Sequence, residues 1–242
     1  MKNTNVLAAL VLALGLAVGG GLVGWGFARG RSADRYVEVK GLAEREVTAD
    51  LALWPLRFVS SANDLATAQS QITSSYDAVV AFLAKHGIEQ SATQLQNLRV
   101  SDANTNQYQR PGAGGPRFVI EQTIIVRLNK PEIVRGASQR VGELVAAGVV
   151  LSEGGEYGSS GPTFVFNRLN DLKPAMIAEA TANARAAAEQ FARDSGSRLG
   201  AIRQANQGVF VILPRDQAPG ISESSQLQKT VRVVSTVQYF LD

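Results

Sequence analysis

The sequence predicts an α+β fold with mixed or antiparallel sheets and three main helices, preceded by one N-terminal transmembrane helix. Three observations support this prediction. An uninterrupted apolar segment lies near the start of the chain. Beyond it, predicted helices alternate with pairs of strands, so that many neighbouring strands can form antiparallel hairpins. Finally, 45% of the 242 residues are hydrophobic, which is typical of a chain with a packed core.

The apolar segment covers residues 6–28, all of which are Ala, Val, Leu, Gly, Trp or Phe. A helix of this length spans roughly 34 Å, enough to cross a bilayer. We therefore expect residues 1–28 to form an uncleaved membrane anchor. The alternative is a cleavable signal peptide, whose apolar region is usually only about 7 to 15 residues long. Residues 26–28 are the candidate cleavage site for that alternative.

Small residues form two stripes on the predicted anchor helix. Helices in lipid associate through close packing of small residues, and two stripes suit a helix with a neighbour on each side. This pattern predicts a ring or bundle of anchors, although Gly and Ala are also simply common in membrane helices. The candidate packing residues are Ala8, Gly15, Gly19, Gly20, Gly24 and Gly26.

The charges that flank the anchor leave its orientation open. Lys2 precedes the segment, whereas Arg29, Arg31, Arg35 and Lys40 follow it. The positive-inside rule would place the following domain in the cytoplasm. A secretory interpretation requires the opposite orientation.

After a polar linker at 29–35, one domain is predicted over 36–242, with three helices. The first covers 63–86, with Asp64 as its N-cap and Gly87 as its stop signal. Pro131 opens the second, at 131–147, and Pro174 starts the third, which runs to residue 194. The third helix has a narrow face of mostly small residues, which predicts a close approach to a sheet.

Alternating apolar residues predict strands in pairs between these helices. Trp54-Pro55 indicates a sheet edge or bulge, because proline lacks an amide hydrogen. Two strands are expected within 36–59, and the others at 94–100, 118–128, 149–151, 163–169, 209–213 and 230–241. Polar loops are expected at 104–116, 154–161 and 214–228.

Motifs for catalysis are missing from the sequence. The chain has no cysteine and one histidine, His86, which excludes zinc-cysteine and multi-histidine metal sites. It has neither a P-loop nor a Gly-x-Ser-x-Gly elbow. The net charge is only +3, without a run of Lys or Arg, so a nucleic-acid partner is not expected. We therefore expect no enzyme activity, no cofactor, no metal and no catalytic residue.

The candidate oligomer contacts are Trp54, Tyr108 and Arg110. The last two lie in a flexible polar segment that can become ordered against another subunit or a ligand. Edge protection is the alternative role for Trp54-Pro55, and a solvent-exposed linker is the alternative for the segment around Tyr108.

Three parts of the chain resemble the SIMPL-domain family of bacterial periplasmic and envelope immunogenic proteins. One is Val37-Glu38-Val39-Lys40-Gly41, and another is the closing strand with Val231, Val233, Val237 and Phe240. The most specific is the helix with Ala184-Arg185, Ala188-Glu189 and Phe191-Ala192, which ends through Gly196 to Leu199-Gly200. The chain departs from the family at Ala43, where a second glycine is usual, and at Thr48-Ala49-Asp50, where Pro-Asp is common.

This resemblance, which spans about residues 36–241, implies a SIMPL-like α+β domain in the cell envelope that assembles into large homo-oligomers. It implies no catalytic residues, and it suggests a link to stress tolerance. We expect a single-pass inner-membrane protein with its domain in the periplasm, whose partners are the lipid bilayer and further copies of itself in a cage- or channel-like scaffold. The alternative is an envelope module that binds an unspecified small molecule or protein without large assembly.

Overall fold

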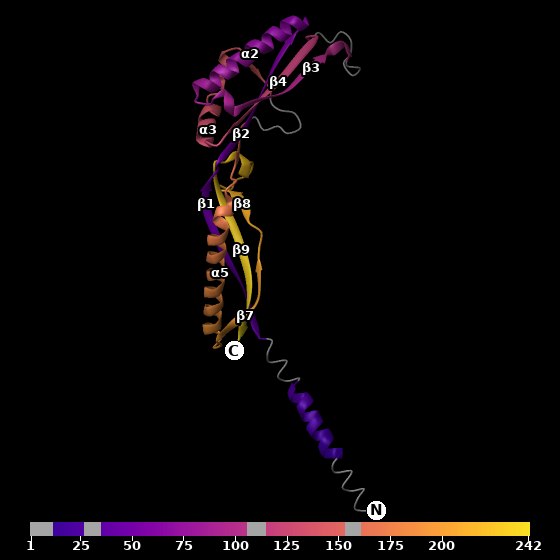
Figure 1. Ribbon diagram of the computed structural model, residues 1–242, viewed down its shortest axis with the longest axis vertical. Helices are drawn as coiled ribbons and strands as arrows, with labels where there is room; N and C mark the ends of the chain where they lie inside the picture. Colours follow the sequence, from indigo (N-terminus) through magenta and orange to yellow (C-terminus); the bar gives the residue numbers. More distant parts are fainter. Residues whose placement is uncertain (1–11, 27–34, 106–114, 153–160) are drawn as a thin grey trace, which may run out of the picture. The chain divides into compact units, whose positions relative to one another are not determined.

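The computed structural model describes residues 12–26, 35–105, 115–152 and 161–242 (Figure 1). These residues divide into two compact units. Unit 1 holds the described residues up to Ala43, together with Ala175–Phe210 and Val233–Asp242. Unit 2 holds those within Glu44–Pro174 and Val211–Arg232. The described ranges contain five α-helices and two antiparallel sheets, which confirms the predicted α+β class.

The first sheet has the strand order β1-β9-β7, with β8 also pairing with β9. Its strands are β1 (Tyr36–Thr48), β7 (Leu199–Gln207), β8 (Val211–Pro214) and β9 (Gln228–Leu241). Every second residue of β9 is buried, from Lys229 to Tyr239, so this strand turns one face to the interior. Strand β7 pairs with β9 through two register shifts, with Ala205 opposite Val237.

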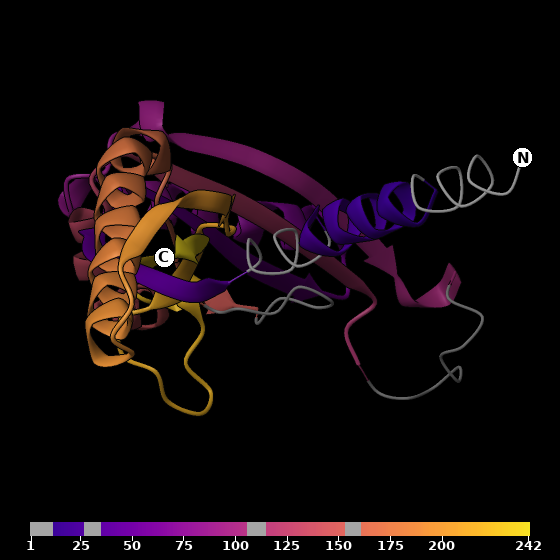
Figure 2. The same ribbon diagram turned by 90° about the horizontal axis from the view of Figure 1, so that it is seen from below.

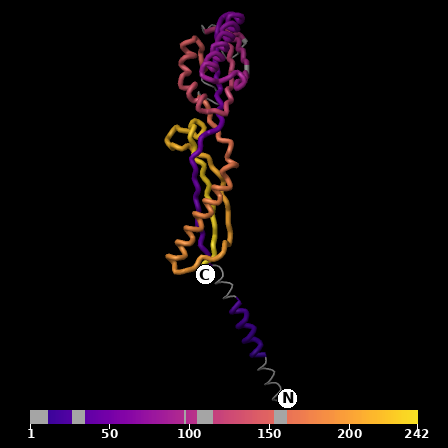
Figure 3. Tube along the Cα trace, turned by 60° about the vertical axis from the view of Figure 1, so that its left-hand side comes forward, coloured from indigo at the N-terminus to yellow at the C-terminus, as the bar shows by residue number. Residues whose placement is uncertain are grey.

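Helix α5 (Leu169–Asp194) packs on this sheet in unit 1, alongside β9 (Figures 2 and 3). Ala180, Ala184 and Ala188 are completely buried at the contact. A Cβ atom on Gly41 of β1 would lie 1.8 Å from the carbonyl oxygen of Ala180, so only glycine fits there. The predicted small-residue face therefore does approach a sheet closely, whereas Phe191 near the end of the helix is exposed.

Unit 2 contains the second sheet, with the order β3-β4-β2-β5 and with β6 also paired to β2. Its strands are β2 (Leu51–Ala62), β3 (Thr93–Asp102), β4 (Phe118–Leu128), β5 (Val150–Leu151) and β6 (Thr163–Val165). On one side of β2, β6 pairs with residues 51–53 and β5 with residues 58–59. Pro55 lies between these two partners. The predicted sheet irregularity at Trp54-Pro55 is therefore a gap between two short neighbours of an inner strand.

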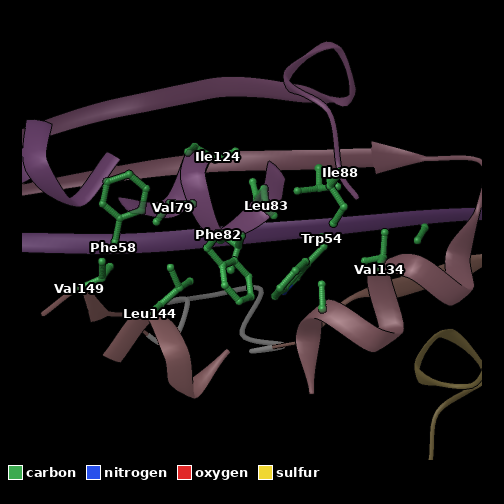
Figure 4. Packing of buried hydrophobic residues seen from close by; sticks show 14 of the residues in the cluster. Trp54, Phe58, Val79, Phe82, Leu83, Ile88, Ile124, Val134, Leu144 and Val149 are labelled. Carbon is green, nitrogen blue, oxygen red and sulfur yellow. The ribbon is translucent and has the colours of Figure 1, made fainter. Parts of the chain in front are cut away.

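Three helices cover one face of this sheet: α2 (Leu65–Lys85), α3 (Pro131–Ser138) and α4 (Gly142–Ala146). Figure 4 shows their apolar side chains meeting those of β2 and β4. Trp54 packs edge-on against Phe82 of α2, with ring centroids 6.5 Å apart. Short 3-10 turns complete the described fold at Gln90–Ala92, Ala103–Thr105 and Glu223–Ser225.

The structure corrects two helix predictions. The segment 131–147 forms two short helices, α3 and α4, in place of one, with a break at residues 139–141. Helix α5 begins at Leu169, before Pro174, so the predicted strand at 163–169 ends at Val165. Asp50 stabilises this early start, because its carboxylate accepts hydrogen bonds from the backbone N–H groups of Asn167 and Arg168, each at 3.1 Å.

One strand was not predicted at all. Strand β7 consists mainly of alanine and uncharged polar residues, and nearly all of it is exposed. An exposed edge strand does not need apolar residues in alternation, so the period-two signal is missing.

Residues 12–26 form the first described helix. No helix in the described part of the chain is both long enough and apolar enough to cross a membrane. Residues 1–11 and 27–28 of the predicted anchor lie outside the described ranges. The anchor and the proposed boundaries at 28 and 35 remain predictions.

Candidate interaction surface

Strand β3 forms an edge of the sheet in unit 2. It pairs with β4, and no other described strand lies on its opposite side. In the β3–β4 register, Leu95 is opposite Ile124 and Val100 is opposite Ile120. Residues directly opposite each other share a face of the sheet, and here the two isoleucines are buried in the helix-covered core. Leu95 and Val100 therefore continue the core face onto the edge strand.

The helices leave this part of the face uncovered. Ile120 and Ile124 are at most 1% exposed, whereas Leu95 is 50% and Val100 is 49% exposed. Leu98, which is 56% exposed, lies within a register irregularity between Gln96 and Arg99. We call Leu95, Leu98 and Val100 the β3 apolar strip. It borders an open strand edge, which is the part of a sheet best suited to pair with another chain.

An ion pair fixes the far end of β3 to β4. The Arg117 guanidinium donates two hydrogen bonds to the Asp102 carboxylate, from Nε at 3.2 Å and from Nη2 at 3.1 Å. The backbone N–H of Asn104 donates a further bond to the same carboxylate, at 2.9 Å. These donors hold the pKa of Asp102 below its ordinary value, with the Arg117 hydrogen bond as the main cause. This ion pair adds to the β3–β4 pairing that holds the strip beside β4.

The β7 edge of the other sheet differs in chemistry. Gln204, Asn206 and Gln207 of β7 are exposed, and Ile202 is its one large exposed apolar side chain. A mostly polar edge that also carries the charged Arg203 gains less from leaving water than an apolar one does. Between the two edges, β3 is the better candidate for a stable contact.

The predicted anchor-packing residues lie on an open helix surface where the structure describes them. Gly15, Gly19, Gly20, Gly24 and Gly26 are exposed, and a Cβ atom added to any of them would meet nothing within 4 Å. Ala8 lies outside the described residues. The packing role of these residues stays a prediction.

The predicted oligomer contacts are Trp54, Tyr108 and Arg110, and the structure describes only the first of them. Trp54 is 1% exposed and belongs to the core of unit 2, so its ring is not available on the surface for a subunit contact. Its large apolar side chain faces the helices because alternate residues of β2 do so. Tyr108 and Arg110 lie outside the described residues, and their role remains a prediction.

The sequence predicts a strand at 94–100 but does not single out the β3 apolar strip. The available signal was the spacing of Leu95, Leu98 and Val100 among polar residues. That pattern does not reveal that β3 lies at an edge or that α2 leaves it uncovered. Among the described residues, no three His, Asp or Glu side chains are grouped so that they could hold a metal ion.

The fold defines the class of protein as α+β with two antiparallel sheets, and its candidate site is an apolar strand edge. Residues 37–239 match the family described as "SIMPL: Protein of unknown function (DUF541)". Because this match covers most of the chain, the protein belongs to the SIMPL family, as the sequence resemblance predicted.

No curated protein matches the chain significantly. One similar solved structure is an uncharacterized conserved protein from Listeria innocua, at 11% identity and a TM-score of 0.21. The similarity covers 78% of this chain and 90% of that one.

Proposed function

We propose that this protein is a membrane-anchored component of a bacterial cell envelope that assembles into a large homo-oligomeric scaffold, cage- or channel-like in form and linked to stress tolerance. Membership of the SIMPL family supports this proposal. The β3 apolar strip is the observation that carries it, because such a surface on an open strand edge is stabilised by pairing with another chain.

A second copy of β3 is a suitable partner for this edge. Arg99 is the only charged residue between Thr93 and Ser101, so two antiparallel copies bring few like charges together. The Leu and Val side chains of the two strips then cover each other, and the free backbone groups of the two edges become hydrogen-bonded. This contact joins copies in pairs.

The N-terminal segment supplies the second contact in this proposal. Residues 6–28 anchor the chain in the inner membrane, with the folded domain in the periplasm, and the two small-residue stripes gather neighbouring anchors. Pairs joined through β3 are thereby collected into a larger assembly.

Light scattering of the full chain in mild detergent tests the proposal. We expect a multi-subunit particle for the wild type and a smaller particle for Leu98→Lys and Val100→Lys. Val145→Lys on α4 is the matched control, because Val145 is 60% exposed in the same unit but lies away from β3. A monomeric wild type would overturn the proposal. An equal loss of particle mass in the control would show that β3 does not form the contact between copies.

A further inference from the structure

A recess of about 450 Å³ in unit 2 lies between the end of β2, the first half of α2 and the turn that follows α4. This volume falls within the range of small-molecule sites, about 300 to 1,000 Å³. Its polar lining residues are Ser60, Ser61, Ser70, Gln71, Ser74 and Ser75. None of the residues that line the recess is charged.

Two of these hydroxyl groups use their protons within the protein. Ser60 Oγ donates to the carbonyl oxygen of Ala68 at 2.8 Å, and Ser74 Oγ donates to that of Ser70 at 3.1 Å. Both oxygen atoms therefore act as acceptors toward a ligand. The Gln71 amide can both donate and accept. A fitting ligand must provide donors and acceptors side by side.

The part of α2 beside the recess is uncharged as well. From Leu65 to Tyr76, α2 contains no charged residue, although most of this stretch is exposed. The exposed face of a surface helix normally carries charges. An ionic ligand would therefore find no counter-charge in the lining or on this part of α2, whereas a neutral polar ligand needs none.

The remaining wall is small and apolar. Gly148, Ala147 and Val150 line it, and Gly148 adopts a left-handed conformation with φ of 86°. No atom lies within 4 Å of the position that a Cβ on Gly148 would occupy, so a ligand can approach the backbone at this turn. Such a wall suits the C–H groups of a compact ring.

We propose that this recess binds a neutral saccharide of one or two rings. Sugar hydroxyl groups donate and accept hydrogen bonds in adjacent positions, which matches the serine and glutamine lining. The ring C–H groups match the apolar wall. A saccharide without charge also matches the uncharged lining. This binding does not depend on the proposed assembly.

Calorimetric titration of the full chain with trehalose tests the proposal, with trehalose 6-phosphate as the charged counterpart. An amine-oxide detergent is needed, because maltoside detergents carry a competing saccharide. We expect trehalose to bind and to bind more tightly than its phosphate. We expect Gln71→Ala to weaken trehalose binding about tenfold, as the loss of a hydrogen bond does.

Gln69→Ala is the matched control, because Gln69 is exposed on the same helix but does not line the recess. It should bind trehalose like the wild type. The proposal is wrong if trehalose does not bind, if the two alanine variants lose equal affinity or none, or if the phosphate binds as tightly. Circular dichroism confirms that both variants are folded, and light scattering reports on assembly independently.

Discussion

Lys229 and Glu223 form a partly buried ion pair within unit 2. The fully buried ammonium group of Lys229, on β9, donates hydrogen bonds to the Glu223 carboxylate and, at 2.6 Å, to the backbone carbonyl oxygen of the same residue. The contact fastens the 3-10 turn at Glu223–Ser225 to the sheet. A buried charge requires such partners, because its transfer from water is otherwise very unfavourable.

This contact predicts an asymmetry between two substitutions. Glu223→Ala leaves a buried ammonium group without its counter-charge and should lower the free energy of unfolding by about 3 kcal/mol. Lys229→Met removes the charge while keeping an apolar side chain of similar length, so it should cost less. Urea unfolding of both variants checks this order. Equal losses would show that the charge of Lys229 is not the cause.

The close approach of β1 and α5 in unit 1 predicts that Gly41 cannot be replaced. Gly41→Ala places a methyl group against the carbonyl oxygen of Ala180 and should destabilise the protein by about 3 kcal/mol through overpacking. Gly136→Ala in α3 is the control, because an added Cβ there meets nothing within 4 Å. It should stay within about 1 kcal/mol of the wild type. Similar melting temperatures for the two variants would contradict this packing.

The Asp102–Arg117 ion pair predicts a pH dependence of stability. The folded-state pKa of Asp102 lies below its ordinary value of 3.8, so the stabilisation is complete above that value. It is lost as the pH falls through the lowered folded-state pKa. Arg117→Gln should therefore lose stability at pH 7 and show a smaller drop between pH 7 and pH 3, measured by urea unfolding.

Arg185→Gln is the control for this pH experiment. It removes the same charge from an exposed pair with Glu189 on α5, whose ions are 3.6 Å apart. Such a pair contributes only a few tenths of a kcal/mol. This variant should keep the pH dependence of the wild type, and an equal change in both variants would point to net charge as the cause.

The start of α5 predicts a strong effect at Asp50. Its carboxylate accepts hydrogen bonds from the backbone N–H groups of Asn167 and Arg168 and from the Asn167 side-chain amide. Asp50→Ala should destabilise unit 2 by about 2 to 3 kcal/mol. Asp50→Asn should cost less, because its amide oxygen still accepts. Hydrogen exchange at residues 167–170 locates the effect, and unchanged exchange in the alanine variant would contradict it.

Features set by neighbouring residues could be predicted from the sequence. Asp64 caps α2 as expected, with its side chain accepting the N–H of Thr67 at 2.9 Å. The small side chains of Ala180 and Ala184 predicted the close contact of their helix with a sheet. In each case the physical cause lies within one element.

Features set by distant residues could not be predicted. The start of α5 depends on Asp50, more than 100 residues earlier in the chain. Strand β7 has no apolar alternation, because one edge strand can stay largely exposed. The β3 apolar strip depends on which strands α2 covers. The burial of Trp54 could not be predicted either, because an aromatic residue before proline does not reveal which side of a strand faces the core.

The position of Pro55 limits how the sheet of unit 2 can grow. On that side β2 already has two short partners, and proline between them offers no amide hydrogen, so a single continuous strand cannot be added along β2. A long strand can therefore be added only at β3, because β5 and β6 have only two and three residues. A contact between two β3 edges then uses the open edge of both copies and ends with the pair. This sheet alone cannot propagate an endless fibre, and any larger particle must draw on a second, separate contact.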